Sequence, residues 1–352
     1  MSKRNVRKLR IGVAGLGRIG WGYHCKTIAG HADWQLAAVA DPVSERGQEA
    51  ERTYGCRAFR SVDQMLEEAD LDAVTIATPT HLHCRQTLAA VRHGLHVMLE
   101  KPMASNLADA RAIVRAAQKA RRILTVYQPH RAAAYFQHLK RIIESGRIGE
   151  TYHVRRGAFR FVRRDDWQSL VRYGGGMLGN YGAHGLDQVL ALTGYDVEKV
   201  FCNLRRVASL GDAEDVVKVV YQTRGGVIGE VEINQACLHR PFDIEVYGTR
   251  GVITKNKDEF TVRSLSPRQL RAKRLNASLA SPNREYPSDD VECRVEAIRV
   301  DPKYQVDVYK DFARAIRTGG EPFVPAAQTL EVMRVMEWCR KDSRRIIVTP
   351  LT

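Results

Sequence analysis

The feature that most constrains the fold of this chain is a glycine-rich turn near its beginning. A short apolar run, residues 9–14, leads into Gly15-Leu16-Gly17-Arg18-Ile19-Gly20, and a plausible helix follows. This glycine spacing permits a tight turn, a close approach of the backbone to a diphosphate, and close packing of the helix on the strand. Free N–H groups and the dipole at the start of the helix favour an anion. We therefore expect a dinucleotide site that contains Gly15, Gly17, Arg18, Ile19 and Gly20.

Strand-like and helix-like segments alternate from residue 9 to residue 127. Such alternation predicts a doubly wound parallel sheet, which we assign to a nucleotide-binding domain over residues 1–128. The expected strands span 9–14, 36–40, 71–77, 96–99 and 123–127, and the expected helices span 44–54, a segment from Ser61 with a capping box to Gln64, 81–93 and 105–120.

The pattern changes after residue 127. Longer segments with partial period-two alternation predict a large, mainly antiparallel open sheet with one covered face. These segments are 151–161, 197–207, 215–221, 227–234 and 242–247, with helices expected near 135–145, 304–317 and 326–340. Residues 264–290 are polar and basic, and we expect a long loop there. Residues 129–352 are assigned to a substrate-binding and oligomerisation domain, so that an α/β domain precedes an α+β domain.

The composition excludes several classes of protein. A chain of 352 residues favours two domains, and no apolar run is long enough to cross a membrane. Residues 1–10 carry five basic side chains without a following apolar stretch, which is not the pattern of an export signal. The seven cysteines are widely spaced and form no Cys-x-x-Cys pair. We therefore expect reduced thiols, no metal site and a cytoplasmic location.

The formal net charge of +15 raises the question of an anionic partner. The surplus is spread over both halves of the chain, and its densest cluster is Arg155, Arg156, Arg160, Arg163 and Arg164. In a strand-like segment these arginines could face a sheet surface, an anionic substrate or a polynucleotide. No helix-turn-helix or comparable reading module is visible, so we expect no nucleic-acid partner.

Asp41 stands at the end of the second expected strand, about twenty residues after the glycine turn. An acidic residue at this place accepts hydrogen bonds from ribose hydroxyls and repels a 2′-phosphate, which favours NAD over NADP. Asp41 before Pro42 is also a common turn pair, and Arg46 is close enough in sequence to contact a 2′-phosphate. NAD is therefore the expected cofactor, and NADP is the alternative.

Further segments stand after the expected strands and helices. They are Ala77-Thr78-Pro79-Thr80-His81, Glu100-Lys101-Pro102, Gly146-Arg147-Ile148-Gly149-Glu150, and Gly174-Gly175-Gly176 before His184. Their order and spacing resemble the family of glucose–fructose oxidoreductase, inositol dehydrogenase and rhizopine-catabolism proteins over nearly the whole chain. The resemblance implies a Rossmann domain, a carbohydrate-like substrate, and a homodimer or homotetramer. It also implies an NAD-dependent oxidoreductase that acts on a secondary hydroxyl of a sugar, polyol or glycoside.

The same resemblance implies site residues. Lys101 would touch the reacting hydroxyl and the nicotinamide ribose, beside a cis bond to Pro102, and its ammonium would stabilise a developing alkoxide. His184 is the expected base, because histidine titrates near neutrality. Asn180 replaces the family's aspartate, shares a helical face with His184, and is expected to orient the imidazole. The remaining expected contacts are Thr78, Pro79, His81, Glu100 and Gln128 with the cofactor, and Arg131 and Trp167 with the substrate.

Two alternatives to net oxidation stay open at this point. The first is transient oxidation of a sugar carbon, followed by elimination or hydrolysis and by reduction back, with no net redox change. The second is a cofactor-binding sensor without turnover, for which the departure at Asn180 is the motive. Lys101 in a turn and His184 on a helix could serve structure alone, and Arg131 and Trp167 could equally pack at the domain junction.

Overall fold

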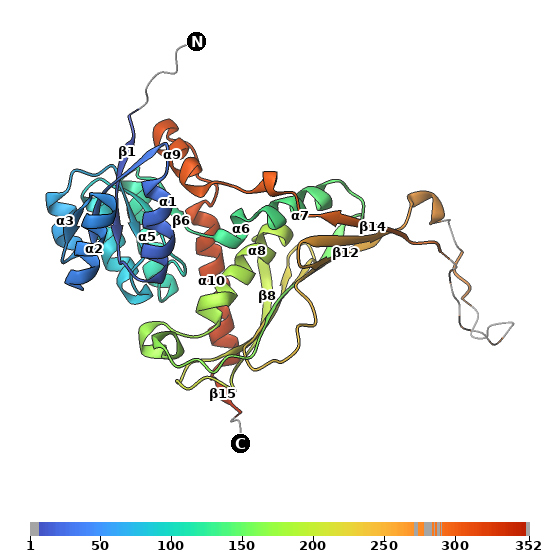
Figure 1. Ribbon diagram of the computed structural model, residues 1–352. Coiled ribbons are helices and arrows are strands. Elements are labelled where there is room, and N and C mark those ends of the chain that lie inside the picture. Colours follow the sequence, from blue (N-terminus) through green and yellow to red (C-terminus); the bar gives the residue numbers. More distant parts are fainter. Residues whose placement is uncertain are drawn as a thin grey trace, which may run out of the picture.

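The computed structural model describes residues 7–270, 274–277, 284, 286, 289 and 291–349. Within these residues, one sheet organises an N-terminal domain and a second sheet organises a C-terminal domain (Figure 1). The N-terminal sheet is parallel, with the strand order β3-β2-β1-β4-β5-β6. Its strands are β1 (Leu9–Ala14), β2 (Trp34–Ala40), β3 (Arg57–Phe59), β4 (Ala73–Ile76), β5 (His96–Leu99) and β6 (Leu124–Val126). The expected parallel sheet is confirmed, and the three-residue strand β3 is an addition to it.

Helices alternate with the strands of this domain along the chain. They are α1 (Lys26–Ala29), α2 (Ser44–Tyr54), α3 (Val62–Glu68), α4 (His83–Arg92) and α5 (Leu107–Lys119), with a π-helical segment η1 (Gly20–Cys25) before α1 and a 3₁₀ turn η2 (Thr80–Leu82) before α4. Ser61 caps α3 by accepting from the N–H of Gln64 at 3.1 Å. The return bond of the predicted capping box is absent, because Gln64 Nε2 donates to Glu68 instead.

The C-terminal sheet has the order β14-β13-β12-β11-β7-β10-β9-β8-β15 in the described part of the chain. Its pairs are antiparallel except β10 with β7 and β15 with β8, so the expected mainly antiparallel sheet is confirmed. The strands are β7 (Thr151–Phe159), β8 (Val197–Arg206), β9 (Val216–Thr223), β10 (Ile228–Asn234), β11 (Ile244–Gly248), β12 (Gly251–Asn256), β13 (Glu259–Ser264), β14 (Arg294–Arg299) and β15 (Ile347–Val348). The predicted loop at 264–290 begins at the last residue of β13, and much of its remainder lies outside the described residues.

Helices cover one face of this second sheet. They include α6 (Pro129–Ala132), α7 (Ala134–Glu144), α8 (Ala183–Thr193) and α10 (Ala326–Ser343), and short helical turns η3 (Trp167–Ser169), η4 (Val171–Tyr173), η5 (Leu178–Gly182), η6 (Pro267–Gln269) and η7 (Pro302–Tyr304) join the elements. In Figure 1, α8 and α10 lie against the sheet on the side of the N-terminal domain. The apolar side chains that alternate along the strands pack under these helices.

The chain returns to the N-terminal domain near its end. Helix α9 (Val308–Thr318) buries Tyr309 and Phe312 in the core beside β1 and β2. Trp34 Nε1 donates to the backbone oxygen of Tyr309 at 2.8 Å, and its ring stacks on Phe312. Residues 308–318 therefore complete the core of the first domain, although they follow the whole second sheet in the sequence. No helix among the described residues is long and apolar enough to cross a membrane.

Strand alternation divides the arginine cluster between two faces of the second sheet. On β7, Arg155 faces away from the helices and pairs with Glu230 and Glu245. Arg156 faces the helices, where it pairs with Asp243 and hydrogen bonds to α8. The cluster is thus not one uniform basic surface.

Candidate active site

The glycine turn joins β1 to η1 at the carboxyl edge of the parallel sheet. Gly15 has φ +88°, and a Cβ there would lie 2.8 Å from the backbone oxygen of Ala77. A Cβ on Gly20 would lie 1.8 Å from the backbone oxygen of Gly15, so only glycine allows the helix to pack this closely. A Cβ on Gly17 would instead stand in open space, toward the cleft described next. The turn therefore has the form that lets a diphosphate approach its backbone.

A cleft of about 710 Å³ opens beside this turn, within the usual size range of small-molecule sites. Its lining includes nine of the expected cofactor residues: Gly15, Gly17, Arg18, Ile19, Asp41, Arg46, Thr78, Pro79 and His81. Gly20 lies buried beneath the turn and does not line the cleft. The open face of Gly17, the helix start and the cleft together fit an NAD(P) dinucleotide.

Asp41 closes one end of the cleft and also holds the glycine turn. Its carboxylate accepts from the N–H of Leu16 at 2.8 Å and from the N–H of Val43 at 3.0 Å. Arg46 Nη1 lies 3.5 Å from Asp41 Oδ2, and Arg60 lines the same end of the cleft. The place expected for an adenosine ribose thus carries one carboxylate and two guanidinium groups.

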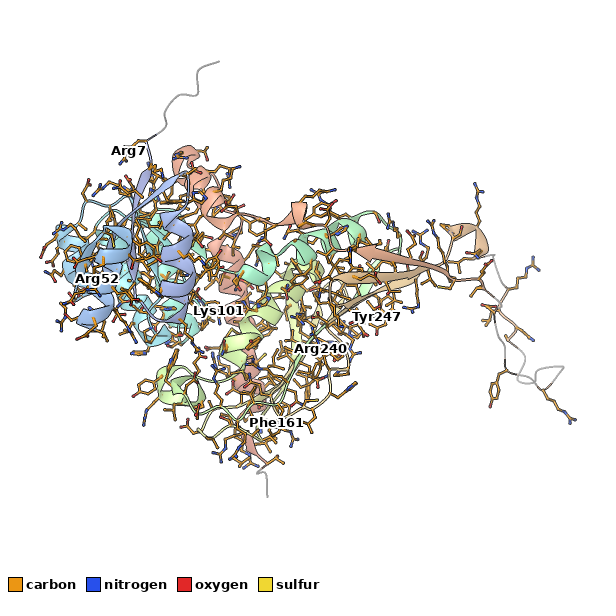
Figure 2. All side chains as sticks on the ribbon, viewed as in Figure 1. Arg7, Arg52, Lys101, Phe161, Arg240 and Tyr247 are labelled. Atoms are coloured by element: carbon orange, nitrogen blue, oxygen red, sulfur yellow. The ribbon has the colours of Figure 1, made fainter. Side chains whose placement is uncertain are left out.

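A smaller cavity of about 120 Å³ continues the cleft toward the second domain. The two cavities share Ile19, Ala77, Thr78, Trp167 and Gln168 in their lining. The smaller one also contains Glu100, Lys101 and Asn180, and Figure 2 shows Lys101 where the two domains meet. This is where a nicotinamide ring at the far end of a dinucleotide would meet a substrate.

Lys101 is held at this junction from both domains. The Lys101–Pro102 bond is cis, and Lys101 Nζ donates to Asn180 Oδ1 at 2.9 Å. Glu100 accepts from the N–H of Lys101 and faces the buried His24, which in turn contacts Tyr309 on α9. Burial lowers the pKa of the Lys101 ammonium, the nearby Glu100 raises it, and Arg164 lowers it further.

The expected pairing of Asn180 with His184 is wrong. Asn180 Oδ1 accepts from Lys101, and Asn180 Nδ2 donates to Gln168 Oε1 at 3.2 Å. Residues 178–182 form the π-helical segment η5, whose wider turn changes the face that each side chain occupies relative to an α-helix. The i, i+4 argument therefore failed, because it assumed a regular α-helix through this segment.

His184 is paired with Gln128 instead. Its Nδ1 lies 2.9 Å from Gln128 Oε1, and a carbonyl oxygen can only accept, so Nδ1 carries the proton and Nε2 is free to accept one. Burial lowers the pKa of His184 well below 6.5, and the charges of Lys101, His130 and Arg156 act in the same direction. The imidazole of His184 is therefore neutral, and Gln128 bonds to it and is not among the residues that line the cleft.

Arg131 and Trp167 have different surroundings. Arg131 is buried, donates from Nε to Asp187 at 2.8 Å, and also donates to Gln328, so the structure gives it a partner in the protein in place of the expected substrate. Trp167 lines both cavities and is partly exposed. The neighbouring Asp166 lies 3.4 Å from Arg18 of the glycine turn, so the segment around Trp167 covers the cleft from the second domain.

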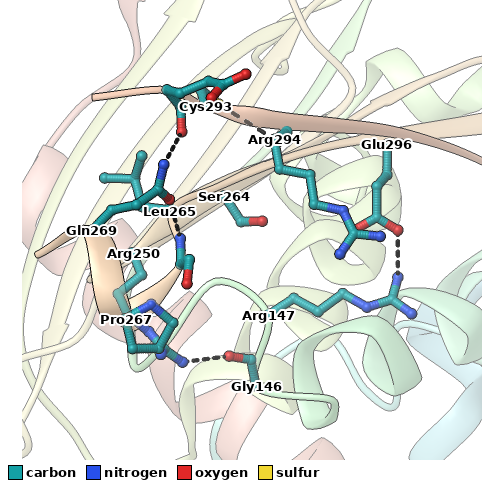
Figure 3. Close-up of a pocket in the computed structure, with 12 residues that line it drawn as sticks. Gly146, Arg147, Arg250, Ser264, Leu265, Pro267, Gln269, Cys293, Arg294 and Glu296 are labelled. Atoms are coloured by element: carbon teal, nitrogen blue, oxygen red, sulfur yellow. Dashed lines mark hydrogen bonds and ion pairs between the residues drawn. The ribbon is translucent and has the colours of Figure 1, made fainter. Parts of the chain in front are cut away.

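A separate cavity of about 620 Å³ lies on the arm formed by β13 and β14 (Figure 3). Two of its three arginines, Arg147 and Arg294, lie near one acid, Glu296, and Arg250 donates to the backbone oxygen of Gly146. It contains none of the expected site residues. The described residues contain no cluster of His, Cys, Asp and Glu that could hold a metal ion.

This fold and this site define a two-domain nucleotide-dependent oxidoreductase. The family model described as "Oxidoreductase family, NAD-binding Rossmann fold" matches residues 9–128, and the model described as "GFO/IDH/MocA C-terminal domain" matches residues 136–254. The chain belongs to the GFO/IDH/MocA oxidoreductase family, as its motifs predicted.

Relatives of known activity share most of the chain. Myo-inositol 2-dehydrogenase of Thermotoga maritima is 30% identical over 266 residues, which cover 72% of this chain and 77% of the relative. D-glucoside 3-dehydrogenase of Escherichia coli is 27% identical over 235 residues, covering 64% and 67%. The crystal structure of the WlbA dehydrogenase from Bordetella pertussis in complex with NADH and UDP-GlcNAcA is 26% identical, with a TM-score of 0.75 and coverage of 98% of this chain and 100% of that chain.

Proposed function

We propose that this enzyme oxidises a secondary hydroxyl of a sugar, polyol or glycoside, with NAD as the electron acceptor. The observation that carries the proposal is the hydrogen bond of Lys101 to Asn180 at the inner end of a dinucleotide cleft, with the charge of Lys101 lowering the pKa of the nearby His184. The named activities of the inositol and glucoside dehydrogenases support the substrate class.

Each residue has a distinct role in the proposed reaction. The bound cofactor supplies the nicotinamide that accepts a hydride from the carbinol carbon. His184 takes the hydroxyl proton on Nε2, because Gln128 fixes the proton of the ring on Nδ1. Lys101 stabilises the developing alkoxide with its ammonium, and Asn180 orients that ammonium through its amide oxygen. Trp167, at the edge of both cavities, is suited to stack on an apolar sugar face.

The proposal is tested by incubating the enzyme with NAD and a panel of polyols, aldoses and glycosides while following NADH by absorbance. We expect net NADH release with at least one member. Product formed without NADH would instead support transient oxidation followed by elimination or hydrolysis. Tight NAD binding with neither NADH nor product across the panel would support a sensor and contradict the proposal.

We expect Asp41 to set the preference for NAD. Asp41→Ala should reduce the ratio of NAD to NADP affinity by about tenfold or more, because it removes a charged hydrogen-bond acceptor and leaves Arg46 and Arg60 beside the ribose. Dissociation constants for both cofactors measure this, with Glu45→Ala on the exposed first turn of α2 as the control. Equal affinities in the wild type, or an unchanged ratio in Asp41→Ala, would refute the assignment.

We expect Asn180→Asp to move the basic limb of the kcat/KM profile upward by roughly one pH unit. Activity needs the Lys101 ammonium and is lost as the pH rises through the pKa of Lys101, which burial lowers. A carboxylate at the place of the amide oxygen, 2.9 Å from Nζ, raises that pKa. Asn256→Asp, exposed at the end of β12, is the control for an added charge. If the basic limb of the Asn180→Asp profile stays at the pH of the wild type, the limb does not report the ionisation of Lys101, and the assignment is contradicted.

We also propose that the chain is a cytoplasmic homodimer or homotetramer. All seven cysteines are free thiols, which suits a reducing compartment. The face of the second sheet opposite the helices carries Arg155, Lys218 and Glu230, and the side chain of Phe201 is exposed. Light scattering on the purified protein measures the oligomeric state directly.

A further inference from the structure

A fourth cavity lies on the helix-covered side of the second sheet, next to the active site. Its volume is about 190 Å³, several times the roughly 30 Å³ that one water occupies in the liquid. The lining consists of Arg156, Gly157, Ala158, Phe159, Arg160, Tyr181, Ile233, Gln235 and Arg240. The cavity is thus built by the end of β7, the end of β10 and the residue that follows Asn180 in η5.

Gln235 in this cavity is a buried polar side chain without a partner. It follows β10 directly and is 1% exposed. Neither its Oε1 nor its Nε2 has a hydrogen-bond partner within the described residues. Buried amide groups are rarely left unpaired, because each unsatisfied group costs on the order of 1–3 kcal/mol. A ligand with a polar group in this cavity would satisfy the amide.

The charges around the cavity favour an anion. Arg156, Arg240 and Lys255 share one carboxylate, that of Asp243. The guanidinium of Arg160 stands over the ring of Tyr181 at 5.1 Å and has no carboxylate partner in the described part of the chain. Positive charge therefore exceeds negative charge here, and guanidinium groups bind carboxylates and phosphates through paired hydrogen bonds.

Two hydrogen bonds and a ring contact connect this cavity to the proposed base. Arg156 Nε donates to Gln188 Oε1 at 3.1 Å, and Gln188 lies one turn beyond His184 on α8. Gln188 Nε2 donates to the backbone oxygen of His130, whose ring meets that of His184 at a centroid distance of 4.6 Å. In Figure 2, the cavity residue Arg240 lies in the C-terminal domain, and Lys101 lies where that domain meets the N-terminal domain. Arg156, which lines the cavity, also acts by its charge on the pKa of His184, so the cavity lies near the proposed base.

We propose that this cavity binds an anionic substituent, a carboxylate or a phosphate, of the carbohydrate substrate. Arg160 and Arg240 would supply charge, and Gln235 would donate from its amide. This inference rests on the proposed function, which supplies the hydroxyl group that reacts. It narrows the substrate class from neutral sugars and polyols to acidic ones.

The test compares matched hexoses in the gluco, galacto and manno series, each as the neutral sugar, the hexuronate and the 6-phosphate. Isothermal titration measures binding to the NAD-loaded enzyme, and absorbance measures NADH formation. We expect the hexuronate or the 6-phosphate of at least one series to bind about tenfold or more tightly than its neutral partner. The affinities of the hexuronate and of the 6-phosphate, compared with each other, show which anion the cavity binds.

Two variants locate the effect. Arg160→Gln should remove most of the preference for the anionic sugar, whereas Arg163→Gln, which removes an exposed arginine outside the cavity, should keep it. Gln235→Leu should weaken anion binding and yet leave or raise the melting temperature, since it removes an unpaired buried amide. Neutral sugars that bind as well as both anions in all three series, or an anion preference that survives Arg160→Gln, would overturn the proposal.

The two proposals fail separately. Anion binding that depends on Arg160 without NADH formation would contradict the oxidation and keep the anion site. NADH formation from neutral sugars, with no gain from either anion, would keep the oxidation and contradict the anion site.

Discussion

Replacement of Lys101 by alanine is expected to lower kcat by on the order of a hundredfold or more while the protein stays folded. The ammonium is the positive group at the inner end of the cleft, bonded to Asn180, and the developing alkoxide would lose its charge partner without it. Because burial already lowers the pKa of this group, its removal relieves a desolvation penalty, and we expect no loss of stability.

The measurement combines turnover, NAD affinity and thermal unfolding for Lys101→Ala, with Lys119→Ala at the exposed end of α5 as the control. We expect a large loss of kcat, NAD affinity within a few-fold of the wild type, and an unchanged melting temperature. Near-normal turnover would refute the catalytic role. A loss of NAD binding together with a lower melting temperature would show that Lys101 serves the structure.

The parts of the site that could be predicted from the sequence are those whose signal is local. Gly15, Gly17 and Gly20 act through their own turn, so their spacing between a strand and a helix indicates the diphosphate-binding form. Lys101 is the second residue after the buried strand β5, and the ends of parallel strands meet at one edge of a sheet. In both cases the sequence pattern and the structure concern the same few residues.

The partners of His184 could not be predicted in this way. Gln128 lies 56 positions away, at the start of a short helix, and only the packing of α6 on α8 brings the two side chains together. The spacing of four residues predicts Asn180 as the partner, but the π-helical turn directs its side chain to Lys101. A glycine before and after Asn180 in the sequence, Gly179 and Gly182, was the available hint that this helix does not begin regularly.

Fold elements were missed for a similar reason. Strands β3 and β15 are too short to show alternation, and β14 is largely exposed, so its sequence is polar. Helix α9 was expected, but its place against β1 and β2 was not, because its apolar face does not specify which core it joins. Local sequence indicates the type of element better than its distant partner.

The second large effect concerns the stability of the fold, and it follows from the buried ion pair of Arg131 with Asp187. Arg131→Leu is expected to lower the free energy of unfolding by about 3–5 kcal/mol, because it leaves the fully buried carboxylate of Asp187 without its partner. A substrate-binding arginine would behave differently, since its loss would raise KM and leave stability nearly unchanged.

Urea unfolding of three variants separates these roles. Arg131→Leu alone should be strongly destabilised, and Arg131→Leu combined with Asp187→Leu should recover much of the loss, because no unpaired charge then remains buried. Arg141→Leu, which breaks the exposed pair with Glu144 on α7, is the matched control and should cost no more than about 1 kcal/mol. Since Asp187 lies one turn beyond His184 on α8, the pair also fixes the helix that carries the base. A stable Arg131→Leu enzyme with a raised KM would show that this arginine meets substrate after all, and that α8 is held in place by its apolar contacts alone.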